Sequence, residues 1–536
     1  MVVKSAYVTH PRIIPDRMED RVYQRVISEH ALRENVLVVL PTALGKTAIA
    51  MRAMAEWVER YPNRSLLFLA PTRPLVQQHA HTIETFLNLP PPAVLTGTIT
   101  PEKRKALFAP PQVVVATPQV IRNDVETGAL SLDLFSMIVF DEAHRAVGDY
   151  PYVDIAMAFK RVKGGRTIGI TASPGNRIER VREVMENIGV TPSGLEVRDG
   201  SESDVEPYRF GIAVEPVYVD NPRVIGEISG ALRHALERRV AALGRYWRQP
   251  QTGEITTSSL LEAGRILQAQ IARFKASGGV PADLWQANTQ QAVAMKLNHA
   301  IELVETQGVN SLERFVERMR GPEKRRSPST GNFLGDPDVR RALTLLASVR
   351  SEHPKIGKTV ELVRDELVYR EGGKVIVFAQ YRDMAELLVD KLRSLSSPQI
   401  RPVRFVGQAT KGVSDKGLKQ KEQVAILEDF RNGTYNCLVA TSVAEEGLDV
   451  PDTDLVIFYE SVPSEIRYIQ RRGRTGRARA GKVVVLLTRG TKDIASHYSS
   501  RNKEWKMKRM IEELKGTPVR AKPARTKSQL VLDNFP

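Results

Sequence analysis

Short apolar segments alternate with longer amphipathic segments through the first 205 residues. Five short apolar runs have the length of buried strands: residues 36–40, 66–70, 113–116, 137–140 and 167–171. Several are rich in β-branched residues, and the stretches between them, such as 47–61, carry apolar residues at helical spacing. Parallel strands separated by crossover helices produce this pattern. The sequence therefore predicts one α/β domain over residues 1–205.

The pattern becomes helical after a strand-like passage at residues 211–219. Three segments have helical apolar spacing and few strand-forming residues: 225–248, 258–276 and 282–307. The following segment, 321–338, is rich in proline, glycine, serine and charge, and is expected to be a loop. We expect residues 206–345 to form an all-helical insertion.

A second α/β pattern covers residues 346–514. Its predicted strands are residues 375–378, 403–405, 437–440, 455–458 and 483–487, and a charged helix at 501–514 closes it. Residues 515–536 are polar and basic, which is typical of a flexible tail. The predicted fold is α/β, with two parallel-sheet domains and the helical insertion between them.

Charge and cysteine content narrow the class of protein. Lys and Arg number 78 against 62 Asp and Glu, a net charge of +16, which suits either a polyanionic partner or simply solvated basic helix faces. Cys437 is the single cysteine, which excludes an intrachain disulfide and a cysteine-cluster zinc site and fits a reducing interior. No long apolar run or secretory signal is present, so we expect a cytoplasmic protein that does not enter a membrane.

The first predicted strand leads into a helix through Leu40-Pro41-Thr42-Ala43-Leu44-Gly45-Lys46-Thr47. A loop in this setting can hold ATP phosphates with its backbone N–H groups and the helix N-terminus. Lys46 would reach the β- and γ-phosphates, and the Thr47 hydroxyl would bind Mg²⁺. Leu40 replaces the usual first glycine, so an ordinary strand-to-helix turn is the alternative.

Another predicted strand ends in Asp141-Glu142-Ala143-His144. Two adjacent carboxylates at a strand tip can share the work of hydrolysis. Asp141 would hold Mg²⁺, and Glu142 would orient and deprotonate the attacking water. A solvated loop is the alternative, and the predicted phosphate-binding loop earlier in the same domain argues against it.

The second α/β domain contains the basic sequence Gln470-Arg471-Arg472-Gly473-Arg474-Thr475-Gly476-Arg477. Arginines are costly to bury in clusters, so a solvated basic helix is the simple interpretation. The catalytic interpretation is that Arg474 and Arg477 reach across from the second domain as arginine fingers and stabilise the transferring phosphoryl group. Domain closure would then complete the ATP site.

These segments resemble motifs I, II and VI of superfamily-two helicases, and segments similar to the other motifs occur in order. The resemblance implies two RecA-like domains with ATP between them. It implies catalytic roles for His144 and Gln470, adenine recognition by Gln24, and nucleotide contacts from Gly447 and Asp449. Nucleic-acid contacts are implied for Pro71, Thr72, Arg73, Gly97, Thr117, Pro118, Gln380 and Thr441. Thr171-Ala172-Ser173 resembles motif III, which couples hydrolysis to strand contacts.

Four segments, 141–148, 299–308, 405–409 and 470–477, further resemble archaeal Hef helicases and their eukaryotic Fanconi-anaemia M relatives. The resemblance covers about residues 1–510. It implies a motor that moves 3′ to 5′ on forked or branched DNA, with the insertion as a thumb-like domain that grips duplex DNA. Ala43 stands where relatives often have glycine. The nuclease and helix-hairpin-helix units of many Hef proteins have no counterpart here, so a separate structure-specific nuclease is the expected partner.

The sequence ends with a segment that resembles a sliding-clamp (PCNA) binding box, Gln-x-x-Leu-x-x-Phe. Leu532 and Phe535 would form the apolar face of a short helical turn, and Gln529 would fill a polar pocket of the clamp. A basic stretch, 515–527, would serve as the tether. Pro536 replaces the usual second aromatic residue, and a chance apolar patch is the alternative.

Three functions remain open from the sequence alone. The first is an ATP-dependent helicase or translocase acting on branched DNA. The second is a motor directed by duplex RNA, because RNA sensors and Dicer share these motifs and a comparable insertion. The third is a loader whose ATP site is a switch that recruits a nuclease to the clamp. The clamp-like tail favours DNA, and ATP turnover separates the third function from the others.

Overall fold

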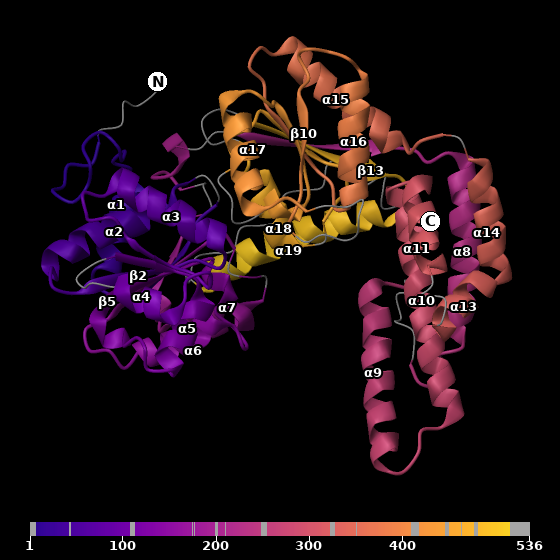
Figure 1. Cartoon of the computed structure of the whole chain (residues 1–536), viewed down its shortest axis with the longest axis horizontal. Helices are drawn as coiled ribbons and strands as arrows, with labels where there is room; N and C mark the ends of the chain where they lie inside the picture. Colours follow the sequence, from indigo (N-terminus) through magenta and orange to yellow (C-terminus); the bar gives the residue numbers. More distant parts are fainter. Residues whose placement is uncertain are drawn as a thin grey trace.

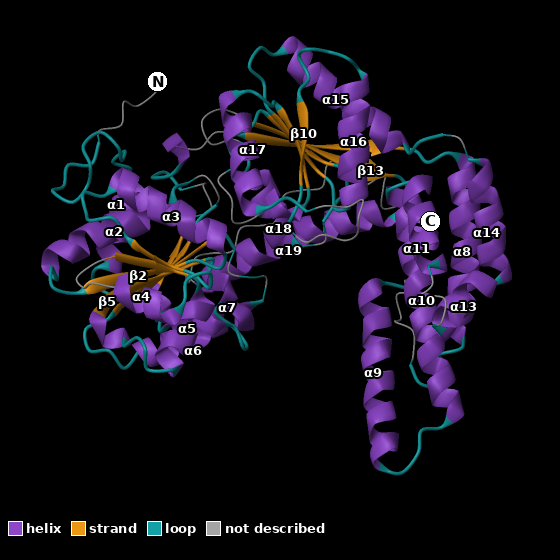
Figure 2. Cartoon of the chain, in the orientation of Figure 1, coloured by secondary structure: helices purple, strands orange, loops and turns teal. Residues whose placement is uncertain are grey.

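Two parallel β-sheets and a helical arm make up the molecule (Figure 1). The computed structural model describes residues 7–41, 44–107, 113–173, 175, 177–198, 202–208, 211–247, 255–321, 327–349, 351–408, 417–444, 450–462, 464–475 and 481–514. Helices cover both faces of each sheet, because a parallel strand pair needs a crossover connection that usually carries a helix (Figure 2). The prediction of two parallel-sheet domains with a helical domain between them is confirmed.

The first sheet has seven parallel strands in the order β3-β4-β2-β5-β6-β1-β7. Its strands and helices are β1 Val36–Val39, β2 Ser65–Leu69, β3 Ala93–Leu95, β4 Val113–Ala116, β5 Phe135–Asp141, β6 Arg166–Thr171, β7 Leu195–Val197, α1 Val22–Ala31, α2 Lys46–Arg60, α3 Arg73–Phe86, α4 Pro101–Leu107, α5 Pro118–Glu126, α6 Pro151–Phe159 and α7 Ile178–Ile188. Alternate side chains of a strand point to opposite faces. Leu67 and Phe68 accordingly pack in different buried clusters.

The second sheet has six parallel strands in the order β10-β11-β9-β12-β13-β8. Its strands and helices are β8 Ile212–Val219, β9 Val375–Phe378, β10 Pro402–Phe405, β11 Cys437–Ala440, β12 Leu455–Phe458, β13 Gly481–Thr488, α15 Pro354–Tyr369, α16 Arg382–Ser394, α17 Gln420–Asn432, α18 Glu465–Arg472 and α19 Lys492–Leu514. The five strands predicted in each α/β domain match observed ones, and so does the strand-like passage at 211–219, which is β8. The three-residue strands β3 and β7 carry too little pattern to be recognised.

Strand β8 changes the boundary of the helical insertion. It pairs with β13 along its full length, from Ile212 opposite Gly481 to Val219 opposite Thr488. The chain therefore adds an edge strand to the second sheet before it leaves to build the helices. The range 206–345 expected for the insertion includes this strand, because local sequence pattern identifies a strand without identifying the sheet that it joins.

The helical arm extends away from the second domain (Figure 1). Its helices are α8 Arg223–Ala241, α9 Thr257–Ala276, α10 Ala282–Thr306, α11 Val309–Arg320, α13 Pro328–Gly335 and α14 Pro337–Ser348. Helix α13 lies inside the segment expected to be a loop, so that expectation is wrong there. Pro328 suits the first helical position, and Phe333 is fully buried in the core of the arm. The burial of Phe333 is a tertiary contact that the proline- and glycine-rich sequence does not reveal.

Helix α19 connects the second domain to the first (Figure 1). It starts at Lys492, nine residues before the predicted helix at 501–514, and two of its methionines, Met507 and Met510, pack into a buried cluster of the first domain. Ile469 of α18 joins the same cluster. The two α/β domains are thus in direct contact through α18 and α19. In the described ranges, no helix is long and apolar enough to cross a bilayer.

Candidate nucleotide and nucleic-acid sites

The strand order of the first sheet gathers the predicted ATP residues at one edge. The loop with Gly45 follows β1, Asp141 ends β5, and Thr171 ends β6 between them. In an open parallel sheet, ligands bind beyond the carboxyl ends of the strands. Neighbouring strands β5, β6 and β1 therefore bring three segments, separated by up to about 130 residues of sequence, to one place.

The loop before α2 is described at Leu44 and Gly45, and both residues are close to side chains of α1. Gly45 has φ 73°, in the left-handed region that favours glycine, and a Cβ atom there would lie 2.5 Å from Gln24 Nε2. The Gln24 amide and the Tyr23 hydroxyl both donate to the Leu44 carbonyl oxygen, at 3.2 and 2.6 Å. Lys46 Nζ donates to the Leu40 carbonyl oxygen at 3.2 Å. The side chains of Tyr23 and Gln24 on α1 thus hold Leu44, the residue before Gly45, in place.

Several predicted residues of this loop can be placed and two cannot. Lys46 and Thr47 lie in the first turn of α2, where helix N–H groups point toward an anion. Pro41 is half-buried at the start of the loop. Thr42 and Ala43 lie outside the described residues.

The two adjacent carboxylates after β5 have different surroundings. Asp141 is 6% exposed, and its Oδ2 accepts a hydrogen bond from His79 Nε2 at 2.8 Å. Glu142 has φ 49°, a left-handed conformation that is costly for a non-glycine residue and that redirects the chain after the strand. Its Oε2 is buried and has no hydrogen-bond partner among the described residues, although His144 Nδ1 is 3.3 Å away. A buried carboxylate oxygen in this state can accept a proton from water.

His144 links the Asp-Glu-Ala-His segment to β6. Its Nδ1 lies 3.0 Å from the Thr171 hydroxyl oxygen. That hydroxyl donates to the Ser173 carbonyl oxygen at 3.0 Å and accepts from the Ser173 N–H at 3.2 Å. The segments that resemble motifs II and III are therefore joined by side-chain hydrogen bonds.

The predicted nucleic-acid residues of the first domain follow the other half of the sheet. Thr72, Gly97 and Thr117 follow β2, β3 and β4, whose carboxyl ends share the edge that holds the ATP residues. Thr72 Oγ1 accepts from the Leu75 N–H at 3.5 Å, which caps α3 beside half-buried Pro71. Arg73 is exposed, with its guanidinium close to Gly97, while buried Thr117 and Pro118 start α5. Arg73 and Gly97 are the exposed members of this set.

The second domain contributes its predicted residues from β9, β11 and α18. Gln380 is exposed after β9, and Thr441 is buried after β11, where its N–H donates to the Phe405 carbonyl oxygen at 3.0 Å. Gln470 and Arg474 are 4% and 8% exposed. The Arg474 carbonyl oxygen accepts from the Thr453 N–H at 3.1 Å, which fixes the backbone after α18.

Three further predicted residues of the second domain, Gly447, Asp449 and Arg477, lie outside the described residues. So do the clamp-box residues Gln529, Leu532 and Phe535.

Two functional-site residues were not found from the sequence. His79 on α3 bonds Asp141, and the Tyr152 hydroxyl on α6 donates to the Asp141 and Leu69 carbonyl oxygens at 2.7 and 3.2 Å. Complete burial raises the pKa of Tyr152, so it remains a neutral donor. Neither residue has a sequence signal, because each is an ordinary buried residue of an amphipathic helix.

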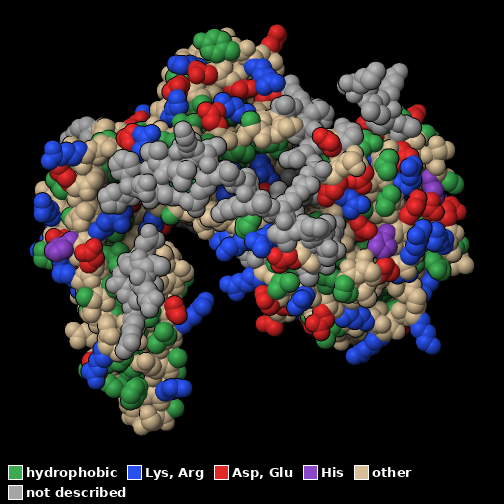
Figure 3. Space-filling view, turned by 180° about the vertical axis from the view of Figure 1, so that it is seen from behind, with side chains coloured by type: hydrophobic (Ala, Val, Ile, Leu, Met, Phe, Trp, Pro, Cys, Tyr) green, Lys and Arg blue, Asp and Glu red, His purple; other side chains and the backbone are tan. Residues whose placement is uncertain are grey.

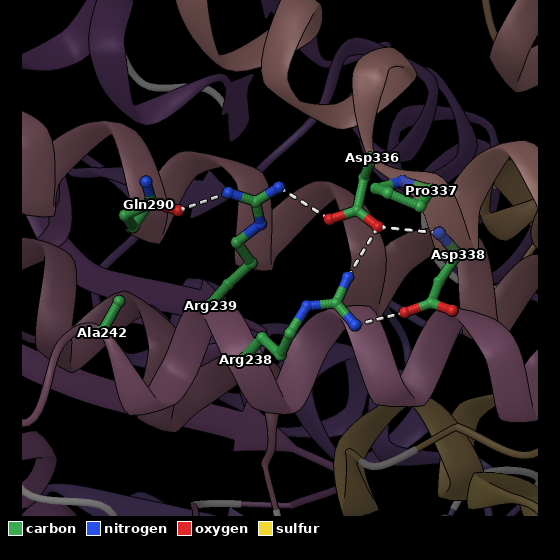
Figure 4. A pocket seen from close by; sticks show the side chains of 7 residues that line it. All are labelled: Arg238, Arg239, Ala242, Gln290, Asp336, Pro337 and Asp338. Carbon is green, nitrogen blue, oxygen red and sulfur yellow. Dashed lines mark hydrogen bonds and ion pairs between the residues drawn. The ribbon is translucent and has the colours of Figure 1, made fainter.

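A separate pocket of about 420 Å³ lies in the helical arm (Figure 4). Arg238 and Arg239 line it, and both are bound to the carboxylate of Asp336 at 2.8 and 2.6 Å. Arg238 also pairs with Asp338. The positive charges of this pocket are therefore balanced within the arm, and the pocket is distant in the fold from the loop of Gly45. Across the described ranges, no group of three or more His, Cys, Asp or Glu side chains is arranged to hold a metal ion.

The fold and site define a two-domain helicase of the DEAD/DEAH box class. The DEAD/DEAH box helicase family matches residues 21–181, the helicase conserved C-terminal domain matches 358–479, and an RNA-helicase helical-bundle family matches 224–353. The crystal structure of the Pyrococcus furiosus Hef helicase domain is 42% identical, with TM-score 0.65, and the match covers 90% of this chain and 98% of that one. The chain belongs to the Hef helicase family.

Full-length relatives extend beyond the matched region. A Methanocaldococcus jannaschii protein named as an ATP-dependent RNA helicase is 38% identical over 95% of this chain and 63% of its own length. The ATP-dependent DNA helicases MPH1 of Coccidioides immitis and Pyricularia oryzae are 33% and 32% identical over 92% of this chain and 46% of their own length. The chain thus spans less than two thirds of the length of each of these relatives.

Proposed function

We propose that this helicase is an ATP-driven motor that moves 3′ to 5′ on DNA and remodels forked or branched DNA. The observation that carries the proposal is that the predicted ATP residues and the predicted nucleic-acid residues lie side by side at the carboxyl ends of the same sheet. The predicted ATP residues follow β1, β5 and β6, and the predicted nucleic-acid residues follow β2, β3 and β4. All six loops stand on one sheet and move as one body, so a domain movement driven by the nucleotide also moves the strand contacts.

The residues around α2 and β5 fit ATP and Mg²⁺. The left-handed Gly45 and the helix N-terminus form a cradle for phosphate, and Lys46 stands at its entrance. Thr47 and Asp141 offer the hard oxygen ligands that Mg²⁺ prefers. When bound, Mg²⁺ would neutralise charge on the β- and γ-phosphates. His79 fixes one oxygen of Asp141, so the carboxylate keeps one orientation toward the metal position.

We assign hydrolysis to Glu142 and to the arginines of the second domain. The unpartnered Oε2 of Glu142 would accept the proton of the attacking water. Arg474 and Arg477 would stabilise charge on the transferring phosphoryl group when the domains close, with Gln470 beside them. Gly447 and Asp449 would contact the nucleotide from the same domain, and Gln24 would reach the adenine after it releases the Leu44 carbonyl oxygen.

The shape and charge of the molecule support a nucleic acid, a polyanion, as the molecule along which the motor moves. Seen from behind, the molecule is hollowed between the helical arm and the first domain, and Lys and Arg side chains border this hollow (Figure 3). Phosphate contacts from such a surface carry no base sequence information. We therefore expect weak sequence preference and strong salt dependence, with the arm as the element that grips the duplex.

A motor directed by duplex RNA is the second candidate. Two findings favour it: the Methanocaldococcus relative is named as an RNA helicase, and the arm matches a helical-bundle family described from RNA helicases. The MPH1 relatives and the Hef structure favour DNA. Backbone-contacting motifs do not separate the two, because the separation depends on duplex shape and the 2′-hydroxyl.

The deciding experiment measures ATP turnover and product formation on matched forked DNA and duplex RNA. Lys46→Ala is the control, because it removes phosphate contact without touching the nucleic-acid loops. DNA-stimulated turnover with remodelled forks is the expected result. Stimulation by duplex RNA alone would replace DNA by RNA as the substrate. Binding of either nucleic acid without turnover would leave only the ATP-switch loader that recruits a nuclease.

We further propose that the tail binds a sliding clamp through Gln529, Leu532 and Phe535, and that a separate structure-specific nuclease works with the motor. Tail removal after residue 528 should abolish clamp binding in a pull-down and leave ATP turnover unchanged, because the tail follows α19 and no ATP-site residue lies in it. The second variant is the double substitution Leu532→Ala and Phe535→Ala in the full chain, which keeps the length of the tail and should also lose clamp binding. Clamp binding that survives both changes would refute the tail assignment.

A further inference from the structure

Helix α19 is attached to α18 of the second domain, and the predicted arginine finger Arg474 follows the C-terminal end of α18. Glu504 of α19 is buried and pairs with Arg472 of α18 at 3.0 Å. Ser500, one turn earlier, donates to the Val462 carbonyl oxygen in the loop before α18. A movement of α18 relative to the first domain therefore carries this part of α19 with it.

The far part of α19 rests on the first domain at the segment that resembles motif III. Met507 is 4% exposed, and its Sδ accepts a hydrogen bond from the Ser173 hydroxyl at 2.9 Å. Met510, one turn further along, is buried in the same cluster. Because Glu504 and Met507 are three residues apart, they lie on the same face of one continuous helix.

Ser173 is connected by hydrogen bonds through Thr171 to His144, which lies beside the predicted catalytic carboxylate. The Thr171 hydroxyl donates a hydrogen bond to the Ser173 carbonyl oxygen, at 3.0 Å. The same hydroxyl oxygen lies 3.0 Å from His144 Nδ1 and can accept a hydrogen bond from it. His144 Nδ1 also lies 3.3 Å from Glu142 Oε2, so a shift of Thr171 changes the position of His144 beside that carboxylate.

We propose that Met507 and Glu504 are positioning residues for ATP hydrolysis and that α19 transmits the position of α18 to Glu142. The route runs from Arg472 to Glu504, along one helical turn to Met507, and through Ser173, Thr171 and His144. Movement of α18, which leads into the predicted arginine finger Arg474, thereby sets the position of the segment that orients the water-activating carboxylate. The inference rests on the proposed catalytic roles of Glu142 and Arg474.

The test replaces Met507 by leucine, which keeps an apolar side chain of similar volume and removes the sulfur acceptor. Met510→Leu is the matched control, because it makes the same change one turn away in the same cluster. We expect Met507→Leu to lower the kcat of nucleic-acid-stimulated ATP turnover by about threefold to tenfold, the effect of one hydrogen bond. The KM for ATP and the melting temperature should stay equal to those of Met510→Leu.

A double-mutant cycle with Ser173→Ala separates coupling from packing. If the two side chains act through their hydrogen bond, the double variant loses no more kcat than either single variant. Equal kcat for Met507→Leu and Met510→Leu would overturn the inference, as would a loss of kcat that is additive in the cycle or accompanied by a fall in melting temperature. A wild-type protein without ATP turnover would refute the proposed function itself, which is a different result from an active protein with an unaffected Met507 variant.

Discussion

Arg471 offers the sharpest test of how the arginine-rich helix is held. Its side chain is fully buried, with the guanidinium carbon 5.0 Å from the Phe378 ring centroid and 5.5 Å from that of Phe458. Burial raises the pKa of Glu460, and the charges of Arg471 and Lys355 act against this rise. Arg471 thus combines two cation–π contacts with the partial neutralisation of a buried acid.

The cost of Arg471→Met follows from these surroundings. Breaking a buried charge pair by removing one partner costs about 3–5 kcal/mol, and each desolvated cation–π contact can add up to about 2 kcal/mol. Glu460 can take up a proton and Lys355 remains nearby, which limits the loss. We therefore expect Arg471→Met to lower the free energy of unfolding by about 3 kcal/mol, the lower end of this range. In a domain of about 150 residues this lowers the melting temperature by roughly 6–12 °C.

The pH dependence has a definite sign. The pKa of Glu460 is already raised in the folded protein, so its contribution to stability is present at low pH and is lost as pH rises through that pKa. Without Arg471 the pKa of Glu460 rises further, because one of the charges that lower it is gone. The variant should accordingly lose more stability at about pH 8 than at about pH 5.5.

Thermal unfolding followed by circular dichroism at the two pH values measures the effect. Arg364→Met is the control, because Arg364 on α15 of the same domain is exposed and its ion pair with Asp365 is worth about 1 kcal/mol or less. Glu460→Gln in the Arg471→Met background should recover part of the lost stability by removing the stranded acid. A melting temperature equal to that of the control, or a loss that is the same at both pH values, would refute this account.

The remaining predictions concern the first domain. Lys46→Ala or Glu142→Gln should abolish ATP turnover and leave nucleic-acid binding in a gel-shift assay largely intact; wild-type turnover in either variant would contradict the site. Gly45→Ala should raise the KM for ATP, because alanine in the left-handed region costs about 1–2 kcal/mol; an unchanged KM would show that the loop adapts. His79→Ala should raise the Mg²⁺ concentration for half-maximal turnover severalfold, since a hydrogen bond to a charged group is worth about 1.5–3 kcal/mol. Exposed His81→Ala on the same helix is its control, and equal Mg²⁺ titrations would contradict the role of His79.

Much of this architecture was determined by local sequence pattern. Buried parallel strands are short apolar runs, and ten such runs predicted their strands because nearly every residue in them is buried, as in Val375–Phe378. The catalytic segments could be predicted for the same reason. They follow those strands directly, so a residue such as Asp141 or Lys46 is placed by the strand or helix next to it.

Only the tertiary structure decided the features that depend on partners far apart in sequence. His79 meets Asp141 across 62 residues, and β8 joins a sheet whose other strands begin beyond residue 370. Arg471 reads as a solvated arginine in the sequence, yet it is buried, because Phe378 and Phe458 from two neighbouring strands supply its surroundings.

Helix α19 shows the physical reason most clearly. Its charged sequence predicts an exposed helix. Its composition does not indicate that Met507 packs against the other domain. The pattern of apolar and polar residues indicates whether a residue suits burial, whereas the fold decides which surface buries it. The sequence by itself therefore determined the elements and the chemistry at their ends, and the packing of distant elements determined how that chemistry is held and connected.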